Sequence, residues 1–297
     1  MPVFRREPVR VRVPATSANL GPGFDSAGLA LALHDEVVVR VVESGLVVEV
    51  SGEGADDVPR TEQHLVVSSL RAAFDRLGGQ PGGLEVTSTN RIPHARGLGS
   101  SAAAIVAAVV AARGLVEDAE LDDDAALALA TELEGHPDNV AACLRGGATF
   151  AWTEDAGPRA VRIDPAADLA PVVFVPSTTA STKEARGVLP AQVPHRDAAA
   201  NAARAALLPL ALSSDPSLLL AATEDRLHQQ YRAPSQPQSA ALVHALRERG
   251  IAAVTSGAGP TVLALTTTST RDAAVAHGAG WQVLPLDVEP AGAHVVA

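Results

Sequence analysis

The stretch that most constrains the fold is RGLGSSAAAIVAAVVAARGL, residues 96–115, in which a turn of glycines and serines runs into small apolar residues. Gly97 and Gly99 can adopt positive φ angles and let a backbone approach an anion closely. The helix that follows, expected to begin near Ser101, offers its first N–H groups to the same anion. The stretch therefore predicts a phosphate-binding turn in front of a buried helix, with an ordinary serine-capped helix start as the alternative.

Two common phosphate-binding loops do not fit this stretch. The Walker A loop ends in Gly-Lys-Ser/Thr, but Lys183 is the only lysine of the chain and lies far away in the sequence. The Rossmann fingerprint G-x-G-x-x-G is also missing, and no acidic residue ends a strand about 20 residues later. A phosphate bound here must therefore be held by backbone N–H groups and serine hydroxyls.

Bulk properties limit the kind of protein that this chain can be. Its 297 residues are 47% hydrophobic, which suits a sizeable core and two sub-domains. The net charge of −11 argues against a nucleic-acid partner. No apolar run reaches the ~20 residues that cross a bilayer, the first ten residues hold no signal-peptide core, and Cys143 has no disulfide partner. We therefore expect a cytoplasmic protein without membrane or nucleic-acid partners.

Strand-like and helix-like segments interleave without a regular βαβ rhythm. Alternation as in VRVRVPAT predicts strands, whereas residues 64–78 and 121–135 have helical spacing and end at glycines. Further helices are expected at 196–212, 216–232 and 239–250. A stretch rich in Pro, Asp and Gly near 152–168 separates two halves. The sequence thus predicts an α+β protein with domains at 1–155 and 156–297.

Three motifs, taken together, resemble those of the GHMP kinase superfamily of small-molecule kinases. They follow the expected order and spacing: PATSANLGPGFDSAGLAL from Pro14, PHARGLGSSAAAIVAAV from Pro93 and TSGAGPTVLAL from Thr255. Within the superfamily the chain is most similar to the homoserine kinase family, because EGHPDNVAA, STKEARGVLP and DRLHQQYR resemble further motifs of that family. Mevalonate kinases carry a lysine in the first motif, and this chain does not.

The resemblance implies a fold, a reaction and its substrates. The fold would be the two-domain GHMP kinase fold, with an N-terminal domain like that of ribosomal protein S5 and a C-terminal ferredoxin-like α/β-plait domain. The reaction would move the γ-phosphoryl group of ATP to the hydroxyl of L-homoserine, with Mg²⁺, for threonine biosynthesis. Such a transfer depends on positioning and charge neutralisation more than on covalent chemistry. The family also suggests a homodimer.

The resemblance assigns ATP and Mg²⁺ to particular residues. The ATP-binding residues would be Pro93, Arg96, Gly97, Leu98, Gly99, Ser100, Ser101 and Ala102. Mg²⁺ would be held by Ser101 and by a glutamate of a following helix, which matching TELEG to the family pattern places at Glu132. Glu134 is the rival, and the two carboxylates are not expected to serve one ion together, because residues two apart point to different sides of a helix.

A site for homoserine needs a different group for each part of the amino acid. The carboxylate requires guanidinium groups, and Arg186 and Arg232 match the family's positions. The ammonium group requires carboxylates, for which Asp25 and Asp138 are the candidates. The hydroxyl requires polar groups from the matching motifs, which are Asn19, His136 and Asn139.

The resemblance implies that Asn139 and Asp138 carry the catalytic step, with Asn139 nearest the hydroxyl. Asp138 is either a general base, as in mevalonate kinases, or an ammonium ligand, as in homoserine kinases. In the second case the hydroxyl proton leaves through the phosphate itself. The turn SGAGP, residues 256–260, is expected to pack behind the phosphate loop, and His228 is expected to be structural.

Three other functions are weighed against this one. A GHMP kinase for another small alcohol would not need all four charged residues of the homoserine site. A catalytically silent nucleotide sensor would have lost Ser101, Glu132 or Asn139, and none is lost. A nucleic-acid-binding module is opposed by the net charge of −11.

Overall fold

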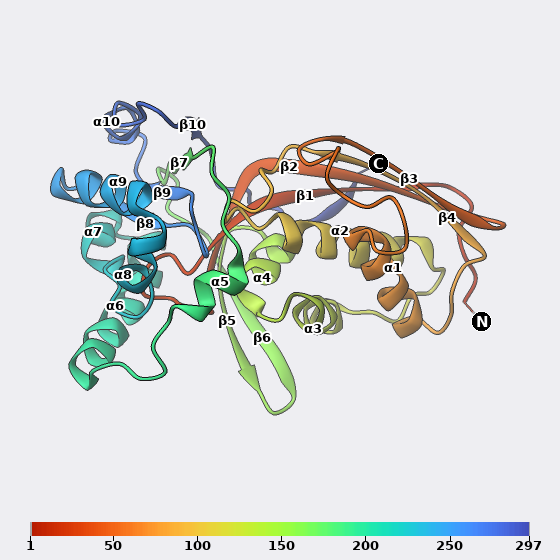
Figure 1. Ribbon diagram of the computed structural model, residues 1–297. Helices are drawn as coiled ribbons and strands as arrows, with labels where there is room; N and C mark the ends of the chain where they lie inside the picture. The colour runs from red at the N-terminus through yellow and green to blue at the C-terminus, as the bar shows by residue number, and fades with distance from the viewer. Residues whose placement is uncertain (1, 297) are drawn as a thin grey trace.

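The computed structural model describes residues 2–296 and contains two separate β-sheets (Figure 1). In the larger sheet the order is β11-β1-β2-β4-β3, while β5 also pairs with β2 and leads on to β6. Its neighbouring strands are antiparallel except for β3 and β4, which are parallel. The strands are β1 (Val9–Ala18), β2 (Ala27–Val42), β3 (Gly45–Gly52), β4 (Gly83–Asn90), β5 (Ala148–Glu154), β6 (Gly157–Ile163) and β11 (His294–Val296).

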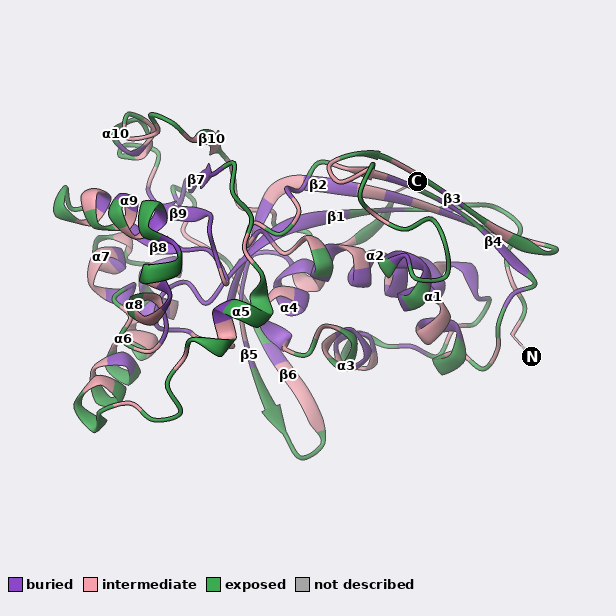
Figure 2. Cartoon of the chain, in the orientation of Figure 1, coloured by how far each residue is buried: buried purple, intermediate pink, exposed green. Residues whose placement is uncertain are grey.

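Four helices gather on one side of the larger sheet, where α2, α3 and α4 contact its strands and α1 packs on α2 (Figure 1). They are α1 (Leu65–Arg76), α2 (Ser100–Leu115), α3 (Asp123–Glu134) and α4 (Pro137–Arg145). Helix α2 occupies the middle, in contact with the other three and with β1 and β2, and Figure 2 shows it as largely buried. Its small side chains let all these neighbours approach closely. The buried helix predicted behind the glycine-rich turn is confirmed.

The smaller sheet has the order β10-β7-β9-β8, and its neighbouring strands are antiparallel. Helices between β7 and β8 and between β9 and β10 produce the βαββαβ succession of a ferredoxin-like domain. The strands are β7 (Val172–Val175), β8 (Ala252–Thr255), β9 (Val262–Leu265) and β10 (Gln282–Pro285). The helices after β7 are α5 (Thr182–Gly187), α6 (His195–Ser213), η1 (Pro216–Leu218), α7 (Leu219–Ala222), α8 (Gln229–Arg232), η2 (Ala233–Ser235), α9 (Pro237–Glu248) and α10 (Arg271–Val275). None of the helices within residues 2–296 is long and apolar enough to span a bilayer.

The α+β class is confirmed, but the single helix predicted over 216–232 is wrong. The structure breaks it into η1, α7, an irregular turn and α8. Asp225 explains the break, because its carboxylate accepts the backbone N–H groups of Leu227, His228 and Gln229 in place of helical carbonyls. The domain boundary after residue 155 stays a prediction; β6 and β11, which follow it, pair within the larger sheet.

Candidate active site

A cavity of ≈ 490 Å³ is lined by residues from both halves of the chain. One end is formed by the turn between β4 and α2, and the other by the turn between β1 and β2 together with α5 and α8. Every site residue predicted from the sequence lines this cavity except Ala102 and Glu132. Ala102 is fully buried in the first turn of the helix that follows this turn, α2.

The turn between β4 and α2 has the backbone expected of an anion site. Gly97 and Gly99 have φ angles of 79° and 69°, in the left-handed region that favours glycine. Gly99 is also the N-cap of α2, and no side chain caps this helix. The first N–H groups of α2 therefore have no intrahelical partner and are available to a bound anion.

The turn is held rigidly from behind. Ser256 Oγ donates to the carbonyl of Gly97 at 2.6 Å, and the N–H of Thr16 donates to the carbonyl of Leu98 at 3.0 Å. A Cβ on Gly97 would lie 2.3 Å from the carbonyl oxygen of Ser256. The glycine turn at 256–260 thus packs directly against the phosphate-binding turn.

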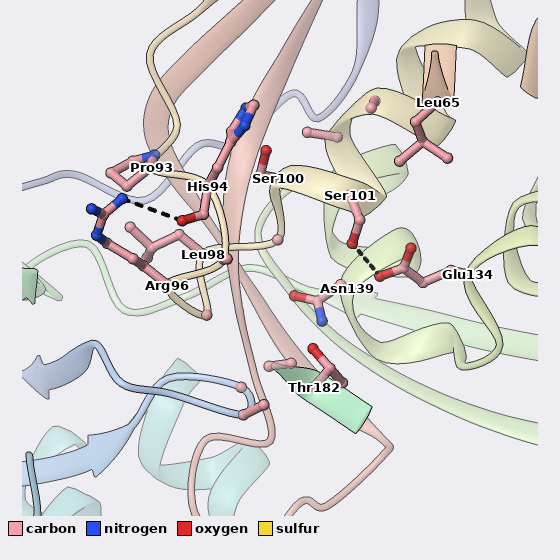
Figure 3. A pocket seen from close by; sticks show the side chains of 18 of the residues that line it. Leu65, Pro93, His94, Arg96, Leu98, Ser100, Ser101, Glu134, Asn139 and Thr182 are labelled. Atoms are coloured by element: carbon pink, nitrogen blue, oxygen red, sulfur yellow. Dashed lines mark hydrogen bonds between the residues drawn. The ribbon is translucent and has the colours of Figure 1, made fainter. Parts of the chain in front are cut away.

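Arg96 lines the cavity and also anchors this turn. Its guanidinium donates to the carbonyls of Pro176 at 3.0 Å, Ser177 at 3.3 Å and His94 at 3.2 Å. Figure 3 shows the side chain beside Pro93, with its bond to the carbonyl of His94 drawn. These bonds tie the phosphate-binding turn to the segment after β7.

The structure separates the two candidate metal ligands. Ser101 Oγ donates to Glu134 Oε1 at 2.7 Å, and Figure 3 shows the two side chains pointing toward one another. Glu132 instead pairs with Arg76 at 3.3 Å, and its side chain is 69% exposed. Burial raises the pKa of the Glu134 carboxyl, against the opposing effect of its bond to Ser101. A hydroxyl and a carboxylate are the hard oxygen donors that Mg²⁺ prefers, so the pair Ser101–Glu134 fits this ion and Glu132 does not.

The first turn of α4 brings three predicted residues together. His136 Nδ1 and Asp138 Oδ1 are 2.6 Å apart, and the Asn139 backbone N–H donates to the same Asp138 oxygen at 2.7 Å. The bond to Asp138 raises the pKa of His136, although burial of the ring opposes it. Thr16, which the sequence analysis did not single out, donates to Asn139 Oδ1 at 2.7 Å and so fixes its amide. The sequence signal that could have identified Thr16 was its place within the motif that starts at Pro14.

The amino-acid end of the cavity contains a bidentate ion pair. Arg186 donates to both carboxylate oxygens of Asp25, at 2.6 and 3.0 Å. This pairing raises the pKa of the Arg186 guanidinium. Asp25 has a φ of 55°, and its backbone N–H donates to Asn19 Oδ1 at 3.0 Å. A guanidinium group and a carboxylate therefore lie side by side where the charged groups of the substrate are expected to bind.

Arg232 lies beside this pair but is buried, with 3% of its surface exposed. Its guanidinium stands 5.5 Å from the centre of the Phe24 ring, and that of Arg186 stands 5.7 Å from the same ring. Phe24, a second residue that the sequence analysis missed, therefore attracts both cations through its π-system. The repulsion of Arg186 and the burial of the group lower the pKa of Arg232, burial being the larger cause.

Family models match both halves of the chain. The model of the GHMP kinases N terminal domain matches residues 64–147, and the GHMP kinases C terminal model matches residues 195–279. The homoserine kinase of Streptomyces avermitilis is 60% identical over 99% of this chain and 98% of its own length. The chain belongs to the homoserine kinase family of GHMP kinases. The homoserine kinase of Streptomyces coelicolor is also 60% identical, over 99% of this chain and 96% of its own.

Solved structures extend the agreement to the whole fold. The homoserine kinase of Cytophaga hutchinsonii superposes with a TM-score of 0.85 at 28% identity, covering 100% of this chain and 99% of that one. Mevalonate kinase of L. major has a TM-score of 0.72 at 16% identity, covering 98% of this chain and 100% of its own, a likeness of fold alone. The two-domain GHMP kinase fold implied by the motifs is confirmed.

Proposed function

We propose that this enzyme transfers the γ-phosphoryl group of ATP to the hydroxyl of L-homoserine, producing ADP and O-phospho-L-homoserine for threonine biosynthesis. One structural observation supports this proposal independently of the family membership. A single cavity joins an anion-binding helix N-terminus to a pair of opposite charges, Arg186 and Asp25. A zwitterionic alcohol bound to that pair would present its hydroxyl toward the phosphate end.

The triphosphate would be held without a lysine. The uncapped N–H groups of α2, together with the hydroxyls of Ser100 and Ser101, face the phosphate end of the cavity. The helix dipole adds about half a positive charge at this point. When bound, Mg²⁺ would neutralise phosphate charge, with Ser101 and Glu134 as its protein ligands in place of the predicted Glu132.

The amino-acid part of homoserine would be bound by charge. Its carboxylate would bind Arg186 and Arg232, and its ammonium group would bind Asp25 and Asp138. Phe24 would attract both guanidinium groups, which stand 5.7 and 5.5 Å from the centre of its ring. Asn19 would fix the backbone of Asp25 through the bond described above.

The reacting hydroxyl would be oriented by Asn139 and His136. Its oxygen would attack the γ-phosphorus in line, while the bond from phosphorus to the β–γ bridging oxygen breaks and ADP leaves. Asp138 Oδ1 already accepts bonds from His136 and from the backbone of Asn139. We assign the Asp138 carboxylate to the ammonium group, and the hydroxyl proton would pass to an oxygen of the transferred phosphoryl group.

ATP turnover with Mg²⁺ tests the proposal, with L-homoserine, L-serine, L-threonine, mevalonate and galactose supplied separately. Strong turnover with homoserine alone is the expected result. Turnover with a different alcohol alone would keep the phosphate end and overturn the assignments at the amino-acid end. ATP binding without turnover on any acceptor would favour the nucleotide sensor.

A further inference from the structure

His228 connects two parts of the amino-acid end although it does not line the cavity. The ring is fully buried, at 0% exposure. Its Nδ1 lies 3.1 Å from Nη1 of Arg232, and its Nε2 lies 2.8 Å from the carbonyl oxygen of Gly21. A guanidinium can only donate and a carbonyl can only accept, so Nδ1 carries the lone pair and Nε2 carries the proton.

The surroundings of His228 hold the ring in this neutral tautomer. Asp225 Oδ2 lies 3.7 Å from Nε2 and also accepts the backbone N–H of His228, so negative charge faces the protonated nitrogen. Burial lowers the pKa of the ring, against the attraction of Asp225. Phe24 stacks on the imidazole, with the ring centres 5.2 Å apart. The lone pair on Nδ1 is thus kept available to Arg232.

The carbonyl that accepts from His228 belongs to a strained turn. Asn19, Leu20 and Gly21 have φ angles of 70°, 47° and 85°, and the first two are not glycine. Side chains with a Cβ are sterically disfavoured in this region of φ, so neighbours must hold the turn in place. A Cβ on Gly21 would lie 2.4 Å from the carbonyl oxygen of Thr223, which shows how closely the turn is packed. The same turn continues to Asp25.

We infer that His228 is a positioning residue that sets Arg232 relative to the turn of residues 19–25. Through that turn it fixes the separation between the group for the substrate carboxylate, Arg232, and the group for the ammonium, Asp25. This inference rests on the proposed function, and it assigns His228 a role in substrate affinity beyond the structural role that the sequence analysis expected. We expect its effect on the amino acid rather than on ATP, because the hydrogen bonds of the His228 ring go to Arg232 and Gly21 and not to the turn of residues 96–101.

Three substitutions at His228 separate positioning from packing. His228→Gln can place an acceptor toward Arg232 and a donor toward Gly21, because its two amide atoms are spaced like the ring nitrogens. His228→Asn keeps an acceptor at the depth of Nδ1 but cannot reach Gly21. His228→Leu fills similar space and supplies neither bond. Asn201→Leu is the matched control, because Asn201 donates to the next carbonyl of the same turn, that of Pro22, at 2.9 Å, and has no bond to Arg232.

The measurement is KM and kcat for homoserine and for ATP in all variants, together with thermal unfolding. We expect His228→Leu to raise KM for homoserine by about tenfold or more, with KM for ATP within about twofold. His228→Gln should have a KM for homoserine close to that of the unmodified enzyme, and His228→Asn should have an intermediate KM. When Arg232→Ala is already present, adding His228→Leu should raise KM for homoserine little further, because His228 acts through that arginine.

Equal losses in Asn201→Leu and His228→Leu would overturn the inference, since loosening of the turn would then explain both. So would a parallel rise of KM for ATP, failure of His228→Gln to rescue, or full additivity with Arg232→Ala. If His228→Leu does not fold, the comparison of His228→Gln with His228→Asn decides the same question. Absence of homoserine turnover in the unmodified enzyme would instead refute the proposed function, so the two failures are distinct.

Discussion

At the phosphate end of the cavity, the binding groups come from one short run of the chain, Gly97 to Ser101. At the amino-acid end, Asp25 and Arg186 are 161 residues apart in the sequence and meet in a bidentate pair. The first end binds with backbone N–H groups and the second with charged side chains. Apart from the Ser101–Glu134 pair, the first end should therefore be more sensitive to changes of backbone than of side chain, and the second end the reverse.

The largest effect is expected from Gly97→Ala at the phosphate end. The added Cβ would meet the Ser256 carbonyl oxygen, and the φ of 79° disfavours alanine, so the turn must move. We expect kcat/KM to fall by about 10³-fold, with ATP affinity reduced, because a shift of this size misplaces the phosphates. Steady-state kinetics and ATP titration measure both effects.

Gly45→Ala is the matched control for that change. Gly45 also has a positive φ, of 88°, but a Cβ there would meet nothing within 4 Å. It should lower the free energy of unfolding by about 1 kcal/mol and leave turnover unchanged. Similar losses of activity in both variants would refute the idea that the close contact with Ser256 matters.

Glu134→Gln should have the next largest effect, because it weakens the protein's hold on Mg²⁺. We expect kcat to fall by about 10²-fold and the Mg²⁺ concentration for half-maximal rate to rise. Glu132→Gln should change neither by more than about twofold, since its pair with Arg76 is exposed. A larger effect of Glu132→Gln than of Glu134→Gln in Mg²⁺ titrations would instead identify Glu132 as the metal ligand.

Arg186→Ala tests the amino-acid end. Removing one partner of a buried, hydrogen-bonded charge pair costs about 2–5 kcal/mol of binding free energy. The Arg186–Asp25 pair is partly exposed, so we expect a cost near the lower end of this range. We expect kcat/KM for homoserine to fall by about 30-fold, with KM for ATP unchanged. Arg196→Ala, at a side chain that is 85% exposed, is the control and should behave as the unmodified enzyme. An equal rise in KM for ATP would contradict the separation of the two ends.

The smallest effect is expected in the pH dependence of stability. The bond to Asp138 raises the pKa of His136, so the folded protein holds this proton more tightly than the unfolded chain does. The resulting stabilisation is complete below the ordinary pKa of 6.5 and is lost as pH rises through the raised pKa. Urea unfolding at a series of pH values should show a slope in this range that His136→Gln reduces. An unchanged slope would show that the pair does not titrate there.

Nearly all of the site residues predicted from the motifs line the cavity, because each motif is a local run whose order along the chain is unambiguous. They could not choose between Glu132 and Glu134. That choice depends on which side of α3 faces Ser101, and the two helices meet only in the folded protein. The broken helix at 216–232 was missed for a related reason: Asp225 competes with the helix through its own side chain.

Glycine spacing and apolar patterning act over a few residues, so the sequence was enough to predict the glycine-rich turn, the buried helix behind it and the family. The assembly of the amino-acid end could not be predicted in this way, because it depends on tertiary contacts. The contacts of Phe24 with Arg186 and Arg232, and that of His228 with Gly21, join residues more than 160 positions apart. Such contacts arise from how the two domains pack, and no local pattern in the chain encodes their geometry.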